Sequence, residues 1–308
     1  MAYASAGGRL RDRLSGGGFA VTAELGPPRA ADPGPIRRAA AALRGRVDAV
    51  NITDNQNAHV RVSALAGAVL AMEAGVEPVL QVTCRDRNRI ALQSDLLGAG
   101  ALGVPNVLLM TGDHPRYGDH ADAAPVFDLD GTGLLGAARA MRDEGRLLSG
   151  RPLDPPPGWL VGAVVDPFTP PAEMGAAPLA KKVAAGAEFV QTQYVFDVAA
   201  FARWMRDVRD RGLDERCHVL AGVGPIRSLR ALEYLSANVP GVRVPEEVTR
   251  RLRGVPGDRV EEEGVALCAE TIAALREVPG VRGVHVMAPG FTHAVPELLD
   301  RAGLPGGE

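Results

Sequence analysis

Short apolar runs alternate with longer helical stretches along the whole chain. The first run predicts a strand, and the pattern from Pro33 to Leu43 that follows it predicts a helix. Strand-like runs then recur, with Ala-rich or Leu-rich helical stretches between them. The eight predicted strands are Ala20–Glu24, Val47–Thr53, Val79–Thr83, Asn106–Met110, Leu160–Val165, Phe189–Gln193, His218–Val223 and Val281–Met287.

Several of these runs are apolar on consecutive residues, as in Val107–Met110. This is typical of parallel strands that are covered on both faces. Eight β–α units in 308 residues therefore predict an α/β fold, a single-domain (β/α)8 TIM barrel over residues 1–308. The alternative is a doubly wound sheet, but no glycine-rich fingerprint follows the first strand. Gly16–Gly18 precedes that strand, so we interpret residues 1–18 as a short flexible lead-in.

Two proline-containing stretches interrupt the pattern. Pro152–Pro157 predicts a long loop before the fifth strand, and Pro240–Gly257 predicts an insertion before the last helix and strand. Neither stretch separates two independent cores, so we expect one domain.

The formal net charge of -3 leaves no basic surplus that could neutralise a nucleic acid or an acidic membrane surface. Three scattered cysteines, Cys84, Cys217 and Cys268, are too few for a disulfide framework or a zinc site with paired ligands. No apolar run reaches the roughly 20 residues of a membrane span, and the first residues lack the apolar core of a signal peptide. We therefore expect a cytoplasmic enzyme that acts on a small molecule.

Polar residues at the carboxyl ends of barrel strands are the first candidates for catalysis. Glu24 ends the first strand, and Asp113 follows the fourth. Burying a carboxylate there is costly without a partner or a task, so we interpret both as catalytic candidates. An ion pair between Glu24 and Arg29 or Arg85 is the structural alternative.

Other strand ends leave two interpretations open. Gln191 and Gln193 are two residues apart on one strand, and they could either read the edge of a polar heterocycle or be satisfied core amides. Asp54 and Asp86 could cap the helices that follow them, which is the interpretation we prefer for Asp86.

We do not expect a metal site. The candidate ligands after the fourth strand all lie in one loop without helical spacing. They are Asp113, His114, Asp119, His120 and Asp122. Cys84 stands beside Arg85 but has no evident histidine partner, so we interpret it as a packing residue.

Ordered motifs at these strand ends point to one family. Glu24 stands ahead of a Pro-Pro pair, Thr53 ends the second strand, and further motifs follow in Gly112–Pro115, Lys182–Ala187 and Gln193–Asp197. In this order and spacing the sequence resembles the methylenetetrahydrofolate reductase family, in its short bacterial form, over nearly the whole chain.

Two further segments, Asp48–Gln56 and Cys84–Gln93, resemble the branch of that family found in acetogens. In acetogens that branch often works beside a zinc-containing partner protein. The resemblance therefore suggests such a partner, and members of the family commonly form homo-oligomers.

The resemblance implies hydride transfer that interconverts 5,10-methylenetetrahydrofolate and 5-methyltetrahydrofolate in one-carbon and methionine metabolism. Glu24 would be the general acid that promotes opening of the five-membered ring. Asp113 would stabilise the cationic iminium at N5, and Gln193 would hydrogen-bond the pterin and fix the hydride geometry.

The resemblance also implies FAD, reduced by NADH or NADPH. The cofactor-binding positions carried over are Thr53, Gln81, Thr111, Gly112, Asp113, Lys181 and Lys182. Gln81 replaces a histidine of the family and Thr111 an arginine, the fifth strand has no tyrosine, and Gly175 and Pro178 replace polar flavin contacts. FAD is favoured, with FMN and direct transfer from the nicotinamide as alternatives.

Gln193, Tyr194 and Phe291 are the substrate-binding residues that the resemblance implies. Phe291 stands where the family has a polar contact near the folate tail, and its ring could stack on the aminobenzoate. Two rival functions remain: a non-redox folate-binding partner in methyl transfer, and a regulatory subunit.

Overall fold

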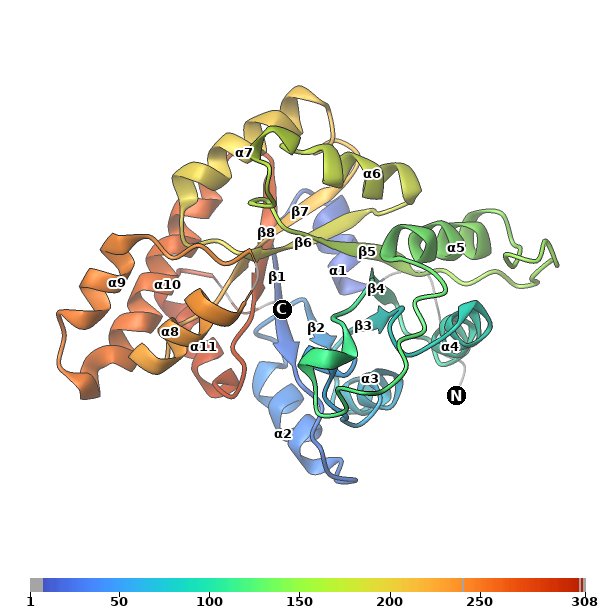
Figure 1. Cartoon of the computed structure of the whole chain (residues 1–308), viewed down its shortest axis with the longest axis horizontal. Helices are drawn as coiled ribbons and strands as arrows, with labels where there is room; N and C mark the ends of the chain where they lie inside the picture. Colours follow the sequence, from blue (N-terminus) through green and yellow to red (C-terminus); the bar gives the residue numbers. More distant parts are fainter. Residues whose placement is uncertain (1–7, 240, 305, 307–308) are drawn as a thin grey trace.

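Eight parallel strands close into a barrel in the computed structural model, which describes residues 8–239, 241–304 and 306 (Figure 1). The strands are β1 (Ala20–Leu25), β2 (Ala49–Ile52), β3 (Pro78–Thr83), β4 (Asn106–Met110), β5 (Leu160–Val165), β6 (Phe189–Tyr194), β7 (His218–Val223) and β8 (Val281–Val286). Each strand pairs with the next in the chain, and β8 closes the barrel by pairing with β1. The predicted (β/α)8 barrel is confirmed, and three strands, β4, β5 and β7, have the predicted bounds.

Helices surround the barrel (Figure 1). Within the described ranges they are α1 (Arg9–Ser15), α2 (Gly34–Leu43), α3 (Ala64–Glu73), α4 (Arg89–Ala101), α5 (Gly131–Asp143), α6 (Ala177–Ala185), α7 (Val198–Asp210), α8 (Leu229–Asn238), α9 (Glu246–Arg253), α10 (Val260–Arg276) and α11 (Val295–Arg301). Short 3-10 helices also occur between these elements, at η1 (Gln56–Ala58), η2 (Pro115–Tyr117), η3 (Ala172–Met174), η4 (Gly257–Arg259) and η5 (Thr292–Ala294). None of these helices is long and apolar enough to cross a membrane.

On β1 to β7 the two faces of each strand contribute to two separate apolar layers. Residues such as Val107 and Leu109 of β4 belong to the large core beneath the helices, whereas Leu108 belongs to a second cluster inside the barrel. That inner cluster joins Ala20, Ala49, Val79, Leu108, Leu160, Phe189 and Leu220 with Leu10 and Leu14 of α1. Gly162 leaves room for the Phe189 ring, since a Cβ there would lie 2.2 Å from the ring's Cζ.

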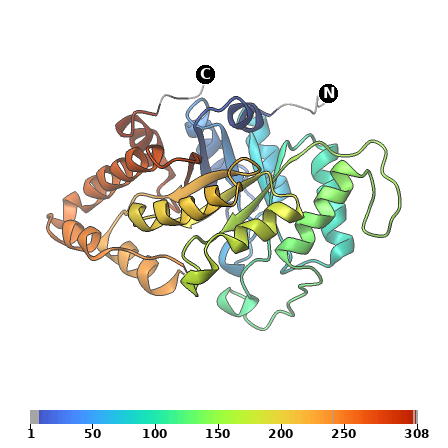
Figure 2. The same ribbon diagram turned by 90° about the horizontal axis from the view of Figure 1, so that it is seen from above.

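The prediction of a flexible lead-in is wrong for the residues from Arg9 to Ser15, which form α1. Leu10 and Leu14 are buried at the amino-terminal end of the barrel. The Glu77 carboxylate accepts hydrogen bonds from the backbone nitrogens of Arg9 and Leu10, at 2.5 and 3.1 Å, and so holds the start of the helix. The rest of the predicted lead-in before Gly8 lies outside the described residues. Figure 2 shows α1 at the opposite end of the barrel from the loop that carries η2.

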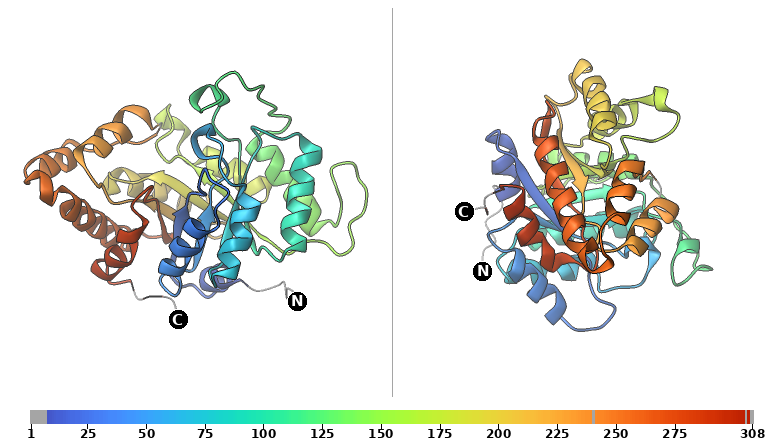
Figure 3. Two further views of the ribbon diagram at one scale, coloured as in Figure 1. Left: turned by 90° about the horizontal axis from the view of Figure 1, so that it is seen from below. Right: turned by 90° about the vertical axis from the view of Figure 1, so that its left-hand side faces the viewer.

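The predicted insertion Pro240–Gly257 contains the helix α9, which the proline-based prediction missed. Glu246 and Glu247 occupy its first turn and Arg250 and Arg251 its last, as the helix dipole favours. Pro240 itself lies outside the described residues. Figure 3 shows α8 and α9 at one end of the molecule, far from α4 and α5. The segment Pro152–Pro157 is irregular, as predicted.

Candidate active site

The parallel barrel brings most of the predicted site residues to one rim, formed by the carboxyl ends of its strands. They are Glu24 near the end of β1, Thr53 after β2, Gln81 on β3, Thr111, Gly112 and Asp113 after β4, and Gln193 and Tyr194 at the end of β6. Lys181 and Lys182 lie instead on α6, and Phe291 lies in the turn after β8.

Glu24 is partly buried, and the loss of water around it raises the pKa of its carboxyl group to about 7. The side-chain amide of Gln56 donates a hydrogen bond to Glu24 Oε1 at 2.9 Å, which opposes this rise. In the described part of the chain Glu24 forms no ion pair with Arg29 or Arg85, so the structural alternative does not hold. A carboxyl group with this pKa is part protonated near neutral pH and can donate a proton.

Gln56 was not among the predicted site residues. The sequence offered only one signal, its place in the loop that follows the second strand.

Tyr194 lies close to Glu24 and is fixed in place. Its ring is buried, and its hydroxyl donates to the backbone oxygen of Met287 at 3.1 Å. Gly224 lets the ring approach, because a Cβ there would lie 2.6 Å from Tyr194 Cε1. Burial, and then the negative charge of Glu24, raise the pKa of the Tyr194 phenol far above its ordinary value. Tyr194 therefore places a buried, neutral side chain beside Glu24.

A buried polar network lies inside the barrel beneath the rim. Asn51 and Gln191 exchange two hydrogen bonds, at 2.6 and 3.0 Å, and the Gln191 amide also donates to Thr22 Oγ1 at 3.1 Å. Thr22 Oγ1 lies 2.9 Å from Nδ1 of His285, and burial lowers the pKa of this imidazole to about 3. Of the two interpretations of Gln191, the structure supports the satisfied core amide.

Gln193 has a different environment from Gln191. It is partly buried, and its Oε1 accepts a hydrogen bond from the backbone nitrogen of Tyr194 at 2.9 Å. The register of β6 against β7 shifts between Gln191 and Tyr194, which breaks the strict alternation that the spacing of two residues assumed.

The remaining rim residues divide by the state of their polar groups. Thr53 Oγ1 is buried and has no hydrogen-bond partner among the described residues, whereas Thr111 Oγ1 accepts from the backbone nitrogen of Gly131 at 3.0 Å. Gln81 is 8% exposed. Gly112 has a φ of +88°, and a Cβ there would lie 2.8 Å from that of Thr83, so the turn requires glycine. Thr53 thus offers a ready hydroxyl for a ligand.

Asp113 is exposed, so the argument that it would be costly to bury does not apply. Neighbouring acids have structural partners instead. Asp54 accepts from Thr83, and Asp86 accepts from Arg85 Nε at 2.8 Å. The predicted helix cap at Asp86 is wrong, because Asn88 caps α4 by accepting from the backbone nitrogens of its first turn.

Cys84 is buried, and burial raises the pKa of its thiol to about 11, which agrees with a packing role. Lys182 is partly buried on α6. Burial lowers the pKa of its amine, and the nearby Asp130 opposes this. Lys181 on the same helix is exposed.

Phe291 is 2% exposed and lies edge-on to His293, with ring centroids 5.1 Å apart. It borders a hollow of about 370 Å³ whose other lining residues include four carboxylates, Asp258, Glu261, Glu262 and Glu297. These charges would repel the carboxylates of a folate tail. The role of Phe291 in binding that tail stays a prediction.

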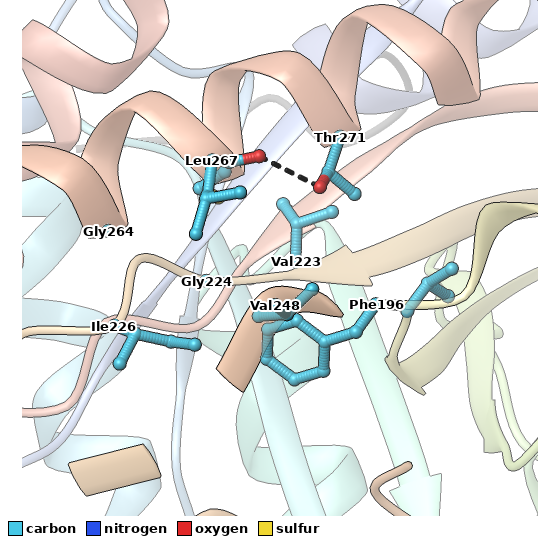
Figure 4. Close-up of a pocket in the computed structure, with 10 residues that line it drawn as sticks. Phe196, Val223, Gly224, Ile226, Val248, Gly264, Leu267 and Thr271 are labelled. Carbon is cyan, nitrogen blue, oxygen red and sulfur yellow. Dashed lines mark hydrogen bonds between the residues drawn. The ribbon is translucent and has the colours of Figure 1, made fainter. Parts of the chain in front are cut away.

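A separate apolar cavity lies between the ends of β6 and β7 and the helices α9 and α10 (Figure 4). Its volume is about 20 Å³, enough for one water-sized molecule. The Thr271 hydroxyl at its wall already donates to the backbone oxygen of Leu267 at 2.9 Å. This cavity is too small for a folate or a flavin, so the open rim is the candidate site.

Comparison with known proteins identifies the family. A family model described as methylenetetrahydrofolate reductase matches residues 9–133 and 164–303. The probable methylenetetrahydrofolate reductase (NADPH) of Caenorhabditis elegans is 25% identical over 249 residues, which are 79% of this chain and 34% of that protein. Methylenetetrahydrofolate reductase (NADH) 1 of Arabidopsis thaliana is 23% identical over 236 residues, 74% of this chain and 38% of that protein. The chain thus spans little more than a third of these relatives.

Among solved structures, an uncharacterized protein from Clostridium thermocellum that binds two copies of 5-methyl-5,6,7,8-tetrahydrofolic acid superimposes with a TM-score of 0.67. It is 13% identical in sequence, and the match covers 93% of this chain and 97% of that one. This likeness supports the barrel fold. Because the family model covers most of the sequence, including the rim described above, the chain belongs to the methylenetetrahydrofolate reductase family.

Proposed function

We propose that this chain is a methylenetetrahydrofolate reductase, which transfers a hydride between a reduced nicotinamide and the one-carbon group of tetrahydrofolate. The observation that carries the proposal is Glu24, a carboxyl group on the barrel rim with a pKa of about 7. Membership of the family supports it. The tetrahydrofolate bound by the Clostridium thermocellum protein supports a folate ligand on this fold.

In this proposal Glu24 acts as the general acid. The bond between the methylene carbon and N10 breaks, and N10 takes its electron pair and the proton of Glu24. The carbon remains attached to N5 as an iminium cation, and addition of a hydride converts it to the methyl group. Glu24 leaves this step as a carboxylate, which the hydrogen bond from Gln56 stabilises.

Asp113 and Gln193 complete the proposed chemistry. Asp113 is an exposed carboxylate in the loop after β4, and it would stabilise the positive charge of the iminium. Gln193 at the end of β6 would hydrogen-bond the pterin and orient it for hydride transfer. Tyr194 would shield the side of Glu24 from water, since its ring is buried there.

We propose FAD as the cofactor, and the residues present fit it. Thr53 holds a buried hydroxyl without a partner in the described residues, which suits a hydrogen bond to the flavin. The ring would be held by Thr53, Gln81, Thr111, Gly112 and Asp113, and the phosphates by Lys181 and Lys182. A bound flavin would relay the hydride from the nicotinamide to the folate.

Two positions do not serve the flavin in this proposal. Gly175 packs against α7, since a Cβ there would lie 2.2 Å from Asp207 Oδ2, and the same carboxylate accepts from Ala176 N at 2.6 Å. Pro178 lies in the first turn of α6. The Asp207 carboxylate thus joins α7 to the residues just before α6.

The hydride donor is NADH or NADPH in this proposal, since one relative is named for each.

We also propose a homo-oligomer, because Ile90 and Leu97 on α4 are apolar residues that are 75% and 37% exposed. Light scattering on the purified protein measures the mass of the assembly. Co-purification from the native cells tests the zinc-containing partner.

An oxygen-free titration tests the proposed function. The protein is loaded with FAD or, separately, FMN, and 5-methyltetrahydrofolate is added while the flavin absorption band is recorded. Bleaching of the band is the expected result, because hydride transfer from the folate would reduce the flavin. A band that the folate leaves unchanged argues against hydride exchange between the folate and a bound flavin. If the protein also shows no nicotinamide-dependent turnover, the result favours the non-redox methyl-transfer partner.

A further inference from the structure

The loop that carries Gln56 has an unusual backbone. Asn55, Asn57 and Ala58 all have positive φ, at 47, 55 and 57°. Residues with a Cβ rarely adopt this left-handed region, and each such residue costs of order 1 kcal/mol or more. Gln56 stands in the middle of this strained segment, and its amide reaches Glu24 Oε1 at 2.9 Å.

Surrounding groups hold the strained loop from several sides. Arg85, only 2% exposed, donates from Nη2 to the backbone oxygen of Asn55 at 3.2 Å. The Asn55 side chain accepts from the backbone nitrogen of Arg61 at 3.0 Å. Both carboxylate oxygens of Asp119, in the loop after β4, accept from the backbone nitrogen of Val60 at 3.2 Å. Strain that is held this firmly is a sign that the loop's shape is needed.

The loop after β2 is also held by close contact with the loop after β4. Gly118 packs so tightly on Ala58 that a Cβ on Gly118 would lie 1.8 Å from the Ala58 carbonyl oxygen. The loop after β2 is therefore locked against the loop that carries Asp113, and both border the rim on which Glu24 lies.

Resting on the proposed function, we infer that Gln56 is a positioning residue for Glu24. Its amide fixes the direction of the Glu24 carboxyl group, and the strained loop keeps the amide in place. Loss of the amide leaves Glu24 free to turn and removes a donor that stabilises its carboxylate.

The other titratable groups around Glu24 do not provide this control. Tyr194 on β6 is a neutral phenol, and His285 on β8 is neutral because burial lowers its pKa to about 3. Asp54, after β2, is paired with Arg87. Gln56 is the hydrogen-bond donor to Glu24 that the described residues provide.

The test compares Gln56→Leu, which removes the amide at similar size, with Asn57→Gly, a control in the same loop that accepts the same positive φ and keeps Gln56. The carbonyl stretch of protonated Glu24, identified by its loss in Glu24→Gln, is followed by infrared spectroscopy against pH. We expect the midpoint to move to higher pH in Gln56→Leu and to stay at the wild-type value in Asn57→Gly. An unchanged midpoint and band position in Gln56→Leu would overturn the inference.

Turnover provides the second readout. The kcat of Gln56→Leu for folate reduction should fall about 10- to 100-fold, with KM changed much less, because orientation and not substrate binding is lost. Asp119→Ala, which frees the loop without touching Gln56, should show the same changes to a smaller degree. Wild-type kcat in Gln56→Leu would contradict the inference. If the wild-type protein shows no reductase activity, the proposed function fails, and the infrared titration still decides the role of Gln56.

Discussion

Asp54 and Thr83 are joined by two hydrogen bonds, from the backbone nitrogen of Thr83 at 2.8 Å and from its hydroxyl at 2.9 Å, both to Asp54 Oδ2. The same oxygen pairs with Arg87, and Asp54 is only 5% exposed. This carboxylate therefore ties the segment after β2 to the end of β3, two residues before Gln56 in the chain.

Replacing Asp54 with Ala should lower the free energy of unfolding by about 3 kcal/mol, because it leaves the Thr83 groups and part of Arg87 buried without an acceptor. Chemical denaturation measures the change. Asp54→Asn is the matched control: it keeps one acceptor oxygen and should lose less. An Asp54→Ala protein as stable as the wild type would show that the contacts of Asp54 with Thr83 and Arg87 do not stabilise the fold.

His285 should make the fold sensitive to acid. Its folded-state pKa of about 3 lies below the ordinary value of 6.5, so between these pH values the unfolded chain binds a proton that the folded protein excludes. Its contribution to stability is therefore complete above about pH 6.5 and falls by up to about 1.4 kcal/mol per pH unit on acidification. His285→Gln should reduce the slope of unfolding free energy between pH 7 and 5. The same change at exposed His120 serves as the control, and equal slopes in wild type and His285→Gln would refute the prediction.

The helix α1 should contribute to stability although it precedes the barrel. Leu14 is 1% exposed and belongs to the cluster at the amino-terminal end of the barrel. Leu14→Ala should therefore cost about 2–5 kcal/mol in denaturant unfolding. Ser15→Ala, at the neighbouring exposed position, should change stability by less than about 0.5 kcal/mol. Equal stability of the two variants would mean that α1 does not seal the barrel.

The rate of folate reduction should depend on the protonation of Glu24. Its pKa of about 7 means that the acid form is abundant below neutral pH and declines above it. The kcat/KM for the folate should therefore fall as the pH rises above about 7, roughly tenfold per pH unit once Glu24 is mostly ionised. Steady-state assays from pH 6 to 9 measure this. A kcat/KM that stays constant across that range would exclude Glu24 as the proton donor.

The barrel could be predicted because its strands carry their own signal. Runs such as Leu160–Val165 are apolar on successive residues, and in a run this short that pattern is typical of a strand covered on both faces. The helix α1 could not be predicted, since Glu77, 68 residues from Arg9 in the sequence, holds its first turn. The helix α9 was hidden by the prolines and glycines around it, although its acidic start and basic end are a helix signal.

The candidate site was predicted in part for a similar reason. Strand order places Glu24 and Tyr194 on one rim, and that order follows from the repeat of β–α units. The partners of the polar groups depend on loop geometry. Asp86 could not be assigned to Arg85, nor Gln56 to Glu24, because backbone angles such as the positive φ of Asn57 decide where these side chains point.

The most direct test of the central claim is the formation of 5-methyltetrahydrofolate by Glu24→Gln and by the wild type. Both proteins are incubated without oxygen with 5,10-methylenetetrahydrofolate, FAD and either NADH or NADPH, and the product is quantified by chromatography. The account predicts product with the wild type and a loss of about 10²- to 10⁴-fold in Glu24→Gln. Near-native product formation by Glu24→Gln, or none by the wild type with either donor, would contradict it.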